Sequence, residues 1–429
     1  MSVIFQNANA MRYRDITLFR IPLRESFRVR NQMQTAHVVI IGGGYGGIRA
    51  IEHLSKNSNI RITLIDKNSY HYMQPEVYDF IANKVDMSHV MIDLPSLCKS
   101  FGLVNFLCDE VIGIDKQSAM VSTSTGNIPY DYLIIATGSR TYFPDFIPGL
   151  REYTHGVKSI PAALNFKQQF ERALLNRIET QTHGCDVEPF NIVIGGAGLS
   201  GVEIVAEMAA YANRFYQNGN FGCRGIDVYL IDAYPTILFG MDQFLIDSAY
   251  ERLIKLGVHV WHNNRISQVR EKEILLDNGK LLSFEFMIFT GGVAASTLTQ
   301  YLGFDTNNKG HLIVDENLNI PTHQNIYAIG DITQALDVNG KFIPPTAQLA
   351  ERGGEHVARN IIASLKGEEK QPFHFKNQGV MIALGGEYGA GVLPGGIKVK
   401  GYLAYLIKKA IFWMYTAPLR RRSTIGKRR

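Results

Sequence analysis

The chain of 429 residues is longer than a single hydrophobic core usually serves, so its length predicts two or three domains. Its apolar share of 46%, charged share of 19% and 40 glycines favour an ordered α/β protein rich in tight turns and exclude a disordered chain. The net charge of +5 comes mostly from the C-terminus, so no nucleic-acid-binding surface is expected. The C-terminal cations are Arg420, Arg421, Arg422, Lys427, Arg428 and Arg429.

An N-terminal extension, residues 1–35, precedes the first clear strand. It contains several arginines and little apolar periodicity, and Asp15 and Glu25 argue against a transit peptide. Met33 lies just before the first strand, so both a functional arm and a misassigned upstream start stay open. The chain contains no run of eighteen uncharged apolar residues, so the sequence predicts no membrane span.

The first dinucleotide-binding pattern begins after the extension. Apolar runs at His37–Ile41 and Ile62–Ile65 predict strands, and Tyr45–Leu54 between them predicts a helix. The turn at residues 42–47 reads Gly-Gly-Gly-Tyr-Gly-Gly and matches GxGxxG between a strand and a helix. In such a turn the glycines allow a tight bend, a close approach to a pyrophosphate and helix–strand packing. Asp66 ends the next strand, where a carboxylate can accept hydrogen bonds from ribose hydroxyls.

A second glycine-rich turn repeats this order in the middle of the chain, and we call the turns at 42–47 and 196–201 the first and second cradle. The strand Ile192–Ile194 leads into Gly-Ala-Gly-Leu-Ser-Gly at 196–201, a helix from about Leu199, and the strand Asp227–Ile231. Asp232 follows without an adjacent arginine, which favours NAD over NADP. This acid lies further from its glycines than the usual spacing of about 20 residues, so a loop or a longer helix must fill the interval.

Further strands end at glycines, where open α/β sheets bind their ligands. They are Tyr132–Ala136, Phe284–Thr290 and Ile326–Ile329. We therefore expect two parts of a first dinucleotide-binding domain around a second one, followed by a C-terminal region. The expected boundaries are 36–150 and 293–372 for the first domain, 151–292 for the second and 373–429 for the C-terminal region.

The four cysteines show neither CxxC nor zinc-ligand spacing, so no redox pair and no metal site are expected. They are read most simply as buried thiols. They are Cys98, Cys108, Cys185 and Cys223.

An apolar helix is expected near the C-terminus, from Tyr402 to Tyr415. At helical spacing Lys408 and Lys409 share one side with Tyr405 and Phe412, and the remaining face is broad and apolar. The segment is too short to span a bilayer, so an interfacial helix with basic flanks is favoured over a helix that packs on the protein or on a second copy. The arginine-rich tail fits either a frayed terminus or attraction to anionic lipid. The apolar face comprises Leu403, Leu406, Ile407, Ala410, Trp413 and Met414.

Together the two cradles, the strand running into Thr137-Gly138 and the segment Asn325–Asp331 resemble the pyridine nucleotide–disulfide oxidoreductase superfamily over about Ala36 to Ser364. The resemblance implies FAD at the first cradle and NADH at the second, with Asp331 bound to the ribityl chain of the flavin. Disulfide reductases of the superfamily need a CxxC pair, which the sequence lacks. Sulfide:quinone reductases use a late cysteine, whereas the last cysteine here is Cys223.

Within the superfamily, type II NADH:quinone oxidoreductases are the most similar. The segment Asn68–Pro75, the triplet Gly201-Val202-Glu203 and the segment Pro345–Ala350 resemble theirs. The resemblance implies that Gln348 contacts a quinone and that Glu203 lies near flavin and nicotinamide. Arg352-Gly353 stands where that family has paired glutamines, which puts the acceptor in question.

The resemblance thus implies an α/β fold with two Rossmann-like domains, for FAD and NAD, and a membrane-associating C-terminal helical segment. His71 and His356 are weighed as proton donors, although lone histidines are more often structural. Tyr45 is expected to pack against the flavin dinucleotide. The implied catalytic residues are Glu203 and Gln348. The implied FAD-binding residues are Gly42, Gly44, Gly46, Gly47, Asp66, Lys67, Ala136, Thr137, Gly138, Gly330, Asp331, Ala347 and Gln348. The implied NADH-binding residues are Gly196, Gly198, Leu199, Gly201, Glu203, Asp232 and Gly291.

The predicted activity is hydride transfer from NADH to FAD, followed by reduction of a membrane quinone without proton pumping. The expected location is the cytoplasmic side of the inner cell membrane, on its surface, and a homodimer stays open. The alternatives are a soluble NAD(P)H-dependent reductase of a ferredoxin-like partner, a sulfide:quinone reductase-like enzyme and a non-enzymatic flavin-binding sensor.

Overall fold

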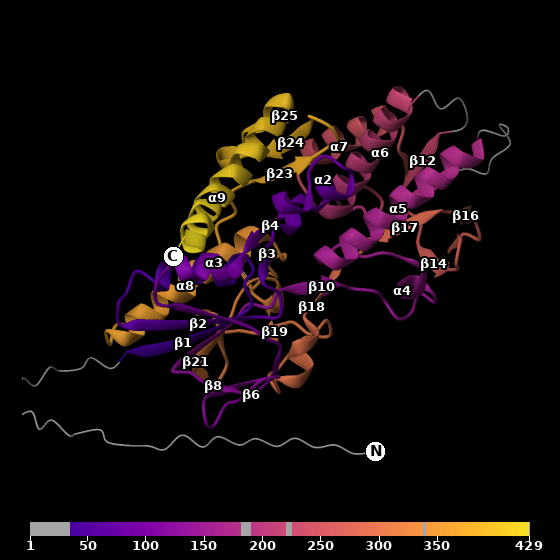
Figure 1. Cartoon of the computed structure of the whole chain (residues 1–429). Coiled ribbons are helices and arrows are strands. Elements are labelled where there is room, and N and C mark those ends of the chain that lie inside the picture. The colour runs from indigo at the N-terminus through magenta and orange to yellow at the C-terminus, as the bar shows by residue number, and fades with distance from the viewer. Residues whose placement is uncertain (1–34, 182–189, 220–224, 338–339, 429) are drawn as a thin grey trace, which may run out of the picture. The chain divides into compact units, whose positions relative to one another are not determined.

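A computed structural model describes residues 35–181, 190–219, 225–337 and 340–428 (Figure 1). The extension up to residue 34 lies outside the described residues, as do Cys185 and Cys223. Of the other two cysteines, Cys98 is buried as expected but Cys108 is exposed at the end of a strand, contrary to the expectation of a buried thiol.

The first sheet has six strands in the order β20-β21-β9-β1-β2-β5, and all neighbours are parallel except β20 and β21. Every residue of β1 is buried, because its side chains alternate between two apolar clusters on opposite faces of the sheet. This explains the continuous apolar run in the sequence. The bounds are β1 Ala36–Ile41, β2 Ile60–Asp66, β5 Val104–Cys108, β9 Tyr132–Ile135, β20 Asn319–Ile320 and β21 His323–Ala328.

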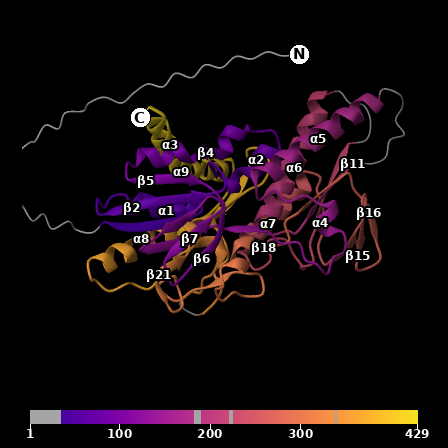
Figure 2. The same ribbon diagram turned by 60° about the horizontal axis from the view of Figure 1, so that its bottom comes forward.

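Helices cover one face of this sheet, and a small antiparallel sheet covers the other (Figure 2). Helices α1 and α8 approach backbone to backbone, because a Cβ at Gly354 would lie 2.3 Å from the carbonyl oxygen of Gly46. The helices are α1 Tyr45–Leu54, α3 Leu94–Ser100 and α8 Ala347–Leu365, and the opposite sheet has the strands β6 Val111–Asp115, β7 Met120–Thr123 and β8 Asn127–Pro129.

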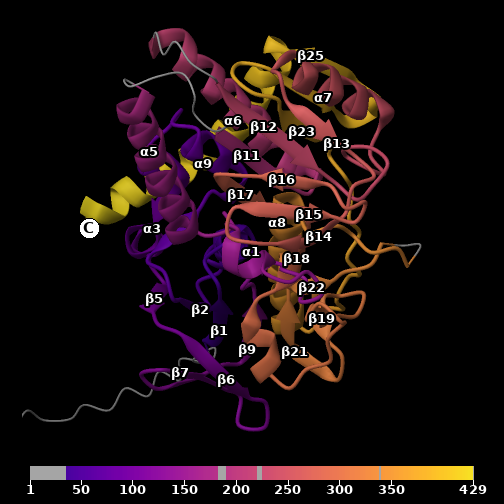
Figure 3. The same cartoon turned by 90° about the vertical axis from the view of Figure 1, so that its right-hand side faces the viewer.

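A second sheet has four parallel strands in the order β13-β12-β11-β17 (Figure 3). Apolar side chains of three helices pack on one face, and the antiparallel sheet β14-β15-β16 packs on the other. The strands are β11 Phe190–Gly195, β12 Ile226–Ile231, β13 His259–Trp261, β14 Ile266–Val269, β15 Glu273–Leu276, β16 Leu281–Ser283 and β17 Phe286–Phe289. The helices are α5 Ile160–Gln181, α6 Leu199–Gly219 and α7 Gln243–Lys255.

Two antiparallel strands, β10 (Ser139–Thr141) and β18 (Val293–Ala295), connect the parts of the chain that form the two large sheets. Beyond α8, an antiparallel sheet β23-β24-β25 leads into the long helix α9. The bounds are β23 Val380–Ala383, β24 Gly389–Val392, β25 Lys398–Gly401 and α9 Tyr402–Arg428. The short elements are β3 Tyr70–Tyr72, η1 Gln74–Glu76, α2 Val77–Ile81, η2 Met87–Val90, β4 Met91–Asp93, α4 Leu150–Tyr153, η3 Thr297–Tyr301, β19 Leu312–Ile313, η4 Gly330–Ile332, β22 Thr333–Gln334 and η5 Pro394–Gly396.

These two βαβ units confirm the predicted α/β fold class, and α1 begins and ends at the predicted residues. Helix α6 accounts for the long interval before Asp232, because it continues to Gly219. Among the described helices, none is both long and apolar enough to cross a lipid bilayer.

Candidate dinucleotide and acceptor site

The two glycine-rich turns have the same backbone geometry. Gly42 and Gly196 have φ values of +107° and +104°, a region that residues with a Cβ rarely adopt. A Cβ at Gly47 would lie 2.0 Å from the carbonyl oxygen of Gly42, and a Cβ at Gly201 would lie 1.8 Å from that of Gly196. These glycines therefore let each helix begin in direct contact with its own turn.

The middle glycine of each turn faces open space. A Cβ at Gly44 or at Gly198 would have no atom within 4 Å. Both positions immediately precede a helix, which begins at Tyr45 in the first unit and at Leu199 in the second. The free N–H groups and the dipole at each helix N-terminus favour an anion at this place, so both turns fit the pyrophosphate of a dinucleotide.

The acid after each cradle also braces the turn. Asp66 accepts hydrogen bonds from the backbone N–H of Gly43 at 2.7 Å and of Asn68 at 2.8 Å. Asp232 accepts one hydrogen bond from the N–H of Ala197 and one from the N–H of Tyr234. Burial raises the pKa of Asp66, and the two backbone hydrogen bonds oppose this shift. Lys67 is exposed beside it.

The neighbouring strand ends close both cradles in the same way. A Cβ at Gly42 would lie 2.4 Å from the carbonyl oxygen of Ala136, and a Cβ at Gly196 would lie 2.7 Å from the nitrogen of Gly291. After Ala136, the hydroxyl of Thr137 is buried without a hydrogen-bond partner within the described part of the chain. Such a hydroxyl is free to bond a ligand or a water molecule. Ala136, Thr137 and Gly291 thus line the cradles, and their contacts with FAD and NADH stay predictions.

Asp331 lies at the end of a hydrogen-bonded chain whose other members, Ser139 and Lys158, were not predicted from the sequence. The Nζ of Lys158 donates to the Oγ of Ser139 at 2.7 Å, and this hydroxyl donates to Oδ2 of Asp331 at 2.8 Å. Lys158 Nζ is 3.6 Å from the same carboxylate oxygen. Burial lowers the pKa of Lys158, while Asp331 opposes that shift. The preceding Gly330 packs against Ala350 of α8, which brings Asp331 beside the first cradle.

Gln348 begins α8 together with Ala347, behind the N-cap Thr346. Its side-chain amide donates to the carbonyl of Gly379 at 3.0 Å and accepts from the N–H of Gln378 at 3.2 Å. The amide thus ties α8 to the segment that leads into β23. Its contact with an acceptor stays a prediction.

The departure at Arg352-Gly353 has a packing explanation in part. Gly353 and Gly354 are both buried, and a Cβ at Gly353 would lie 3.3 Å from the Cβ of Ile329. Glycine at both positions therefore lets α8 lie close to the sheet and to α1. The Arg352 side chain is 43% exposed and pairs with Glu355 at 3.3 Å.

Glu203 connects the second cradle to the C-terminal helix. It lies on α6 just after Gly201 and is 8% exposed. Its Oε1 accepts from the Nζ of Lys408 at 2.7 Å and from the N–H of Ala383 at 3.0 Å. Burial raises the pKa of Glu203, and Lys408 partly opposes the shift.

Both lysines of α9 turn into the protein, which corrects the predicted role of basic groups that flank a membrane-bound face. Lys408 pairs with Glu203, and Lys409 pairs with Glu76 at 2.7 Å and with Asp79. The predicted apolar face is opposite and largely exposed, with exposed fractions of 59% for Leu403 and 66% for Trp413. The two lysines do lie on one side of the helix, as predicted, but this side faces the protein.

The arginine-rich tail is also packed rather than frayed, since α9 extends to Arg428. Arg420 donates to the carbonyl of His89 at 2.6 Å, and the Arg422 guanidinium lies 4.6 Å from the ring centre of Phe101. At Gly426, a Cβ would lie 1.8 Å from the carbonyl oxygen of Ser96 on α3, so the two helices touch through their backbones.

The first cradle and α9 meet at a buried aromatic group. Tyr45 stacks on Tyr415 with ring centres 4.7 Å apart, and His71 lies edge-on to Tyr45. His71 Nδ1 is 2.9 Å from the carbonyl oxygen of Gly43, and its Nε2 is 3.0 Å from the Tyr415 hydroxyl. Burial lowers the pKa of His71 to about 4, so it is neutral near pH 7 and has a structural role.

His356 is likewise a structural residue. Its Nε2 is 3.0 Å from the amide nitrogen of Asn360, and its ring packs against Phe373. Burial lowers its pKa to about 4. Neither histidine weighed from the sequence is placed as a proton donor at neutral pH.

Comparison with known proteins assigns the chain to a family. Residues 36–354 match the family described as pyridine nucleotide-disulphide oxidoreductase, and this match covers most of the chain. The chain belongs to this family.

Relatives of this pyridine nucleotide-disulphide oxidoreductase are recognisable across nearly its whole length. The Type II NADH:quinone oxidoreductase of Staphylococcus epidermidis is 27% identical over 383 residues, which cover 87% of this chain and 93% of the relative. The structure of NDH2 from Plasmodium falciparum in complex with NADH has a TM-score of 0.79 and 21% identity, and the match covers 91% of this chain and 97% of that one. The sulfide:quinone oxidoreductase of Aquifex aeolicus has a TM-score of 0.74 and 20% identity, covering 90% and 92%. Both structures share the fold.

Proposed function

We propose that this pyridine nucleotide-disulphide oxidoreductase is an FAD-dependent NADH:quinone oxidoreductase that does not pump protons. The observation that carries the proposal is the ion pair between Glu203 and Lys408. It joins the helix of the second cradle to α9, whose outer face is apolar and exposed. The candidate nucleotide site and a helix with an exposed apolar face therefore meet at one pair of charges.

FAD would be held by the first cradle, with Thr137 and Asp331 as partners for its polar groups, and NADH by the second. When bound, FAD supplies the two-electron chemistry that links a hydride donor to an acceptor. The overall reaction is NADH + H⁺ + quinone → NAD⁺ + quinol, so one proton per turnover comes from the protein or from water. We propose that Glu203, with Lys408 beside it, supplies that proton and that Gln348 contacts the quinone.

The exposed apolar side chains of α9 support attachment to a membrane surface. They include Leu403, Leu406, Ile411, Trp413 and Met414. An interfacial helix buries such a face at the boundary between headgroups and acyl chains, where a lipid-soluble quinone is available. We propose that the protein lies on the cytoplasmic side of the membrane, where NADH is found.

Anaerobic stopped-flow reduction of the purified holoenzyme tests the proposal. NADH should bleach the flavin absorbance faster than NADPH, and a water-soluble quinone should then restore it. The variant Gln348→Ala should leave bleaching by NADH unchanged and slow the reoxidation by quinone. Bleaching without reoxidation by any quinone would contradict the acceptor assignment and favour a soluble protein partner instead.

A further inference from the structure

A group of seven charged side chains, buried carboxylates with partly exposed lysines, lies between α9 and the unit that contains the second cradle, and we call it the charge assembly. It contains four carboxylates and three lysines from five segments: η1, α2, the segment that follows α2, α6 and α9. All four carboxylate side chains are at most 11% exposed. The members are Glu76, Asp79, Lys84, Glu203, Glu207, Lys408 and Lys409.

Its ion pairs form two branches. In one, Lys409 lies between Glu76, at 2.7 Å, and Asp79. Lys84 forms ion pairs with Oδ1 of Asp79 and with Glu207, each at 2.9 Å. The pair with Asp79 does not have the geometry of a hydrogen bond. Glu207 also accepts from the N–H of Gly386 at 3.2 Å.

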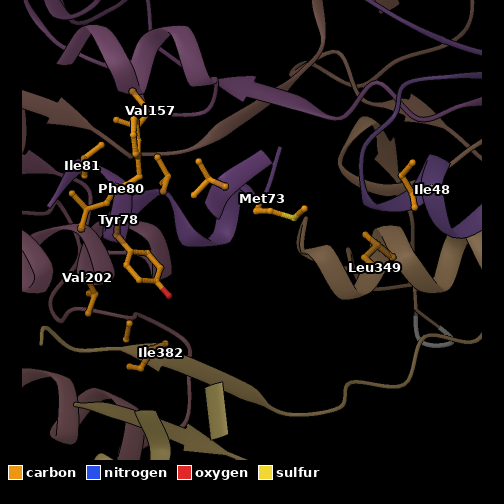
Figure 4. Packing of buried hydrophobic residues seen from close by; sticks show 14 of the residues in the cluster. Ile48, Met73, Tyr78, Phe80, Ile81, Val157, Val202, Leu349 and Ile382 are labelled. Atoms are coloured by element: carbon orange, nitrogen blue, oxygen red, sulfur yellow. The ribbon is translucent and has the colours of Figure 1, made fainter. Parts of the chain in front are cut away.

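The second branch is the pair of Glu203 and Lys408. Glu203 and Glu207 are four residues apart on α6, so their carboxylates share one face of the helix. Tyr78 lies between the branches, because its ring is 5.3 Å from Lys408 Nζ and its hydroxyl donates to Glu76 at 3.1 Å. Figure 4 shows Tyr78 in the same apolar cluster as Val202 of α6 and Ile382 of β23.

Other ionisable groups around the assembly do not balance its charge. Burial lowers the pKa of His89, which is near Lys409, so its ring is neutral near pH 7. Arg252 donates to the carbonyls of Leu384 and Gly385 and makes no ion pair with Glu207 among the described residues. The Tyr405 ring faces Lys84 and Lys409 and adds no charge.

Four carboxylates against three lysines leave one negative charge in a buried site, where an uncompensated charge is strongly unfavourable. We propose that the charge assembly holds one extra proton, shared between Glu203 and Glu207, and that this proton is the one an acceptor takes up at Glu203. Glu207 is then a positioning residue that shares and returns the proton. The inference rests on the proposed function for its acceptor, but the stored proton does not depend on it.

The surroundings of each carboxylate indicate where the proton lies. Asp79 lies between two lysines, which lower its pKa against the effect of burial. Glu76, like Glu207, has one lysine that it shares with Asp79, but it also accepts a hydrogen bond from the Tyr78 hydroxyl. Glu203 and Glu207 lie four residues apart on one face of α6, where two negative charges repel each other. Burial also raises the pKa of both. The two carboxylates of α6 are therefore the ones that retain a proton most readily.

The proton balance is simple. Reduction of a quinone by two electrons needs two protons, of which the hydride of NADH carries one equivalent. The second would pass from the carboxyl of Glu203 to the acceptor oxygen and leave a carboxylate beside Lys408. Water then returns a proton to the assembly, and Glu207 shares it with Glu203.

Infrared spectroscopy of the oxidised holoenzyme tests the stored proton without any acceptor. The wild type should show a deuterium-sensitive C=O band of a protonated carboxylic acid at pH 7. Glu207→Gln leaves three carboxylates for three lysines, so this band should disappear. Lys84→Gln leaves four carboxylates for two lysines, so the band should persist to higher pH. Glu251→Gln removes an exposed carboxylate of α7 that pairs with Lys400, and should leave the band unchanged.

Kinetics provide the second readout. The rate at which quinone reoxidises the reduced enzyme should fall as pH rises past the pKa of the stored proton. Glu207→Gln should lower the pH at which this rate falls by about one unit, and Lys84→Gln should raise it. The pH profile of flavin bleaching by NADH should stay the same in both variants. If Lys84→Gln does not fold, the near-isosteric Glu207→Gln carries the test alone.

The possible results separate the two proposals. A band that is present in Glu207→Gln as in the wild type, or a pH dependence of reoxidation that does not shift, would overturn the stored proton. The predicted infrared changes in an enzyme that reduces no quinone would support the stored proton and contradict only the proposed acceptor.

Discussion

Replacing Lys409 by methionine should loosen α9 from the rest of the protein. The change keeps the length of the side chain but leaves Glu76 and Asp79, whose side chains are 3% and 1% exposed, without their shared lysine. Removing one partner of a buried ion pair typically costs about 3–5 kcal/mol. The lower end applies here, since Lys409 is itself 27% exposed and Asp79 keeps Lys84. We therefore expect a loss of about 3 kcal/mol in the docking of α9.

Limited trypsinolysis measures that docking directly, because the arginines at 420–422 lie in α9. If cleavage follows the opening of the helix, a loss of 3 kcal/mol should speed it by about a hundredfold. Lys400→Met is the matched control: this lysine pairs with Glu251, both side chains are exposed, and the pair should contribute less than about 1 kcal/mol. Equal cleavage rates in the two variants would refute the idea that α9 is held by its buried ion pairs.

Three further predictions concern the cradle, acid stability and the membrane. Gly198→Ala should weaken NADH binding at least about tenfold and leave the melting temperature of the protein unchanged, because its Cβ would enter only the open space of the cradle. Gly201→Ala should lower the melting temperature, because its Cβ would clash with the turn. Equal losses of melting temperature in the two variants would contradict this geometry. Lowering the pH from 7 to 5 should reduce the free energy of unfolding by about 2 kcal/mol through His71. The pKa of His71 is about 4 in the folded state and higher in the unfolded state, so protonation favours unfolding as the pH falls. His71→Asn should therefore unfold in urea with a smaller dependence on pH. Trp413→Glu should reduce sedimentation with lipid vesicles and leave flavin bleaching by NADH intact, and unchanged sedimentation would show that α9 is not the attachment surface.

The cradles could be predicted from the sequence because their requirements are local. Gly42 and Gly196 need a backbone conformation that glycine adopts freely, and Gly47 and Gly201 need the absence of a side chain. Both needs appear as fixed spacings beside apolar runs. The pattern therefore placed strands, turns and helices within a few residues of their observed ends.

The orientation of α9 could not be predicted in the same way. The helical wheel showed that Lys408 and Lys409 share one side, but the carboxylates that bind Lys409 lie more than 300 residues earlier in the chain. A signal was present in Glu76 and Asp79, two acids one turn apart in an otherwise apolar segment. Without their distant partner, that spacing indicates only a polar helix face.

The chain Lys158–Ser139–Asp331 was missed for a related reason. Asp331 was found through the motif that contains it, whereas Ser139 and Lys158 belong to no such motif and meet it only in the folded protein. Long-range partners of a predicted site residue are set by the packing of the sheets, and packing is not readable from a local pattern.

We propose that electrons pass from NADH to a quinone at a membrane surface. An anaerobic titration of the holoenzyme with NADH, on vesicles that contain a long-chain quinone, tests it most directly. One quinol should form for each NADH oxidised, at a rate that falls when the vesicles are left out and a dispersed quinone is used. Oxidation of NADH without formation of quinol on the vesicles would contradict it.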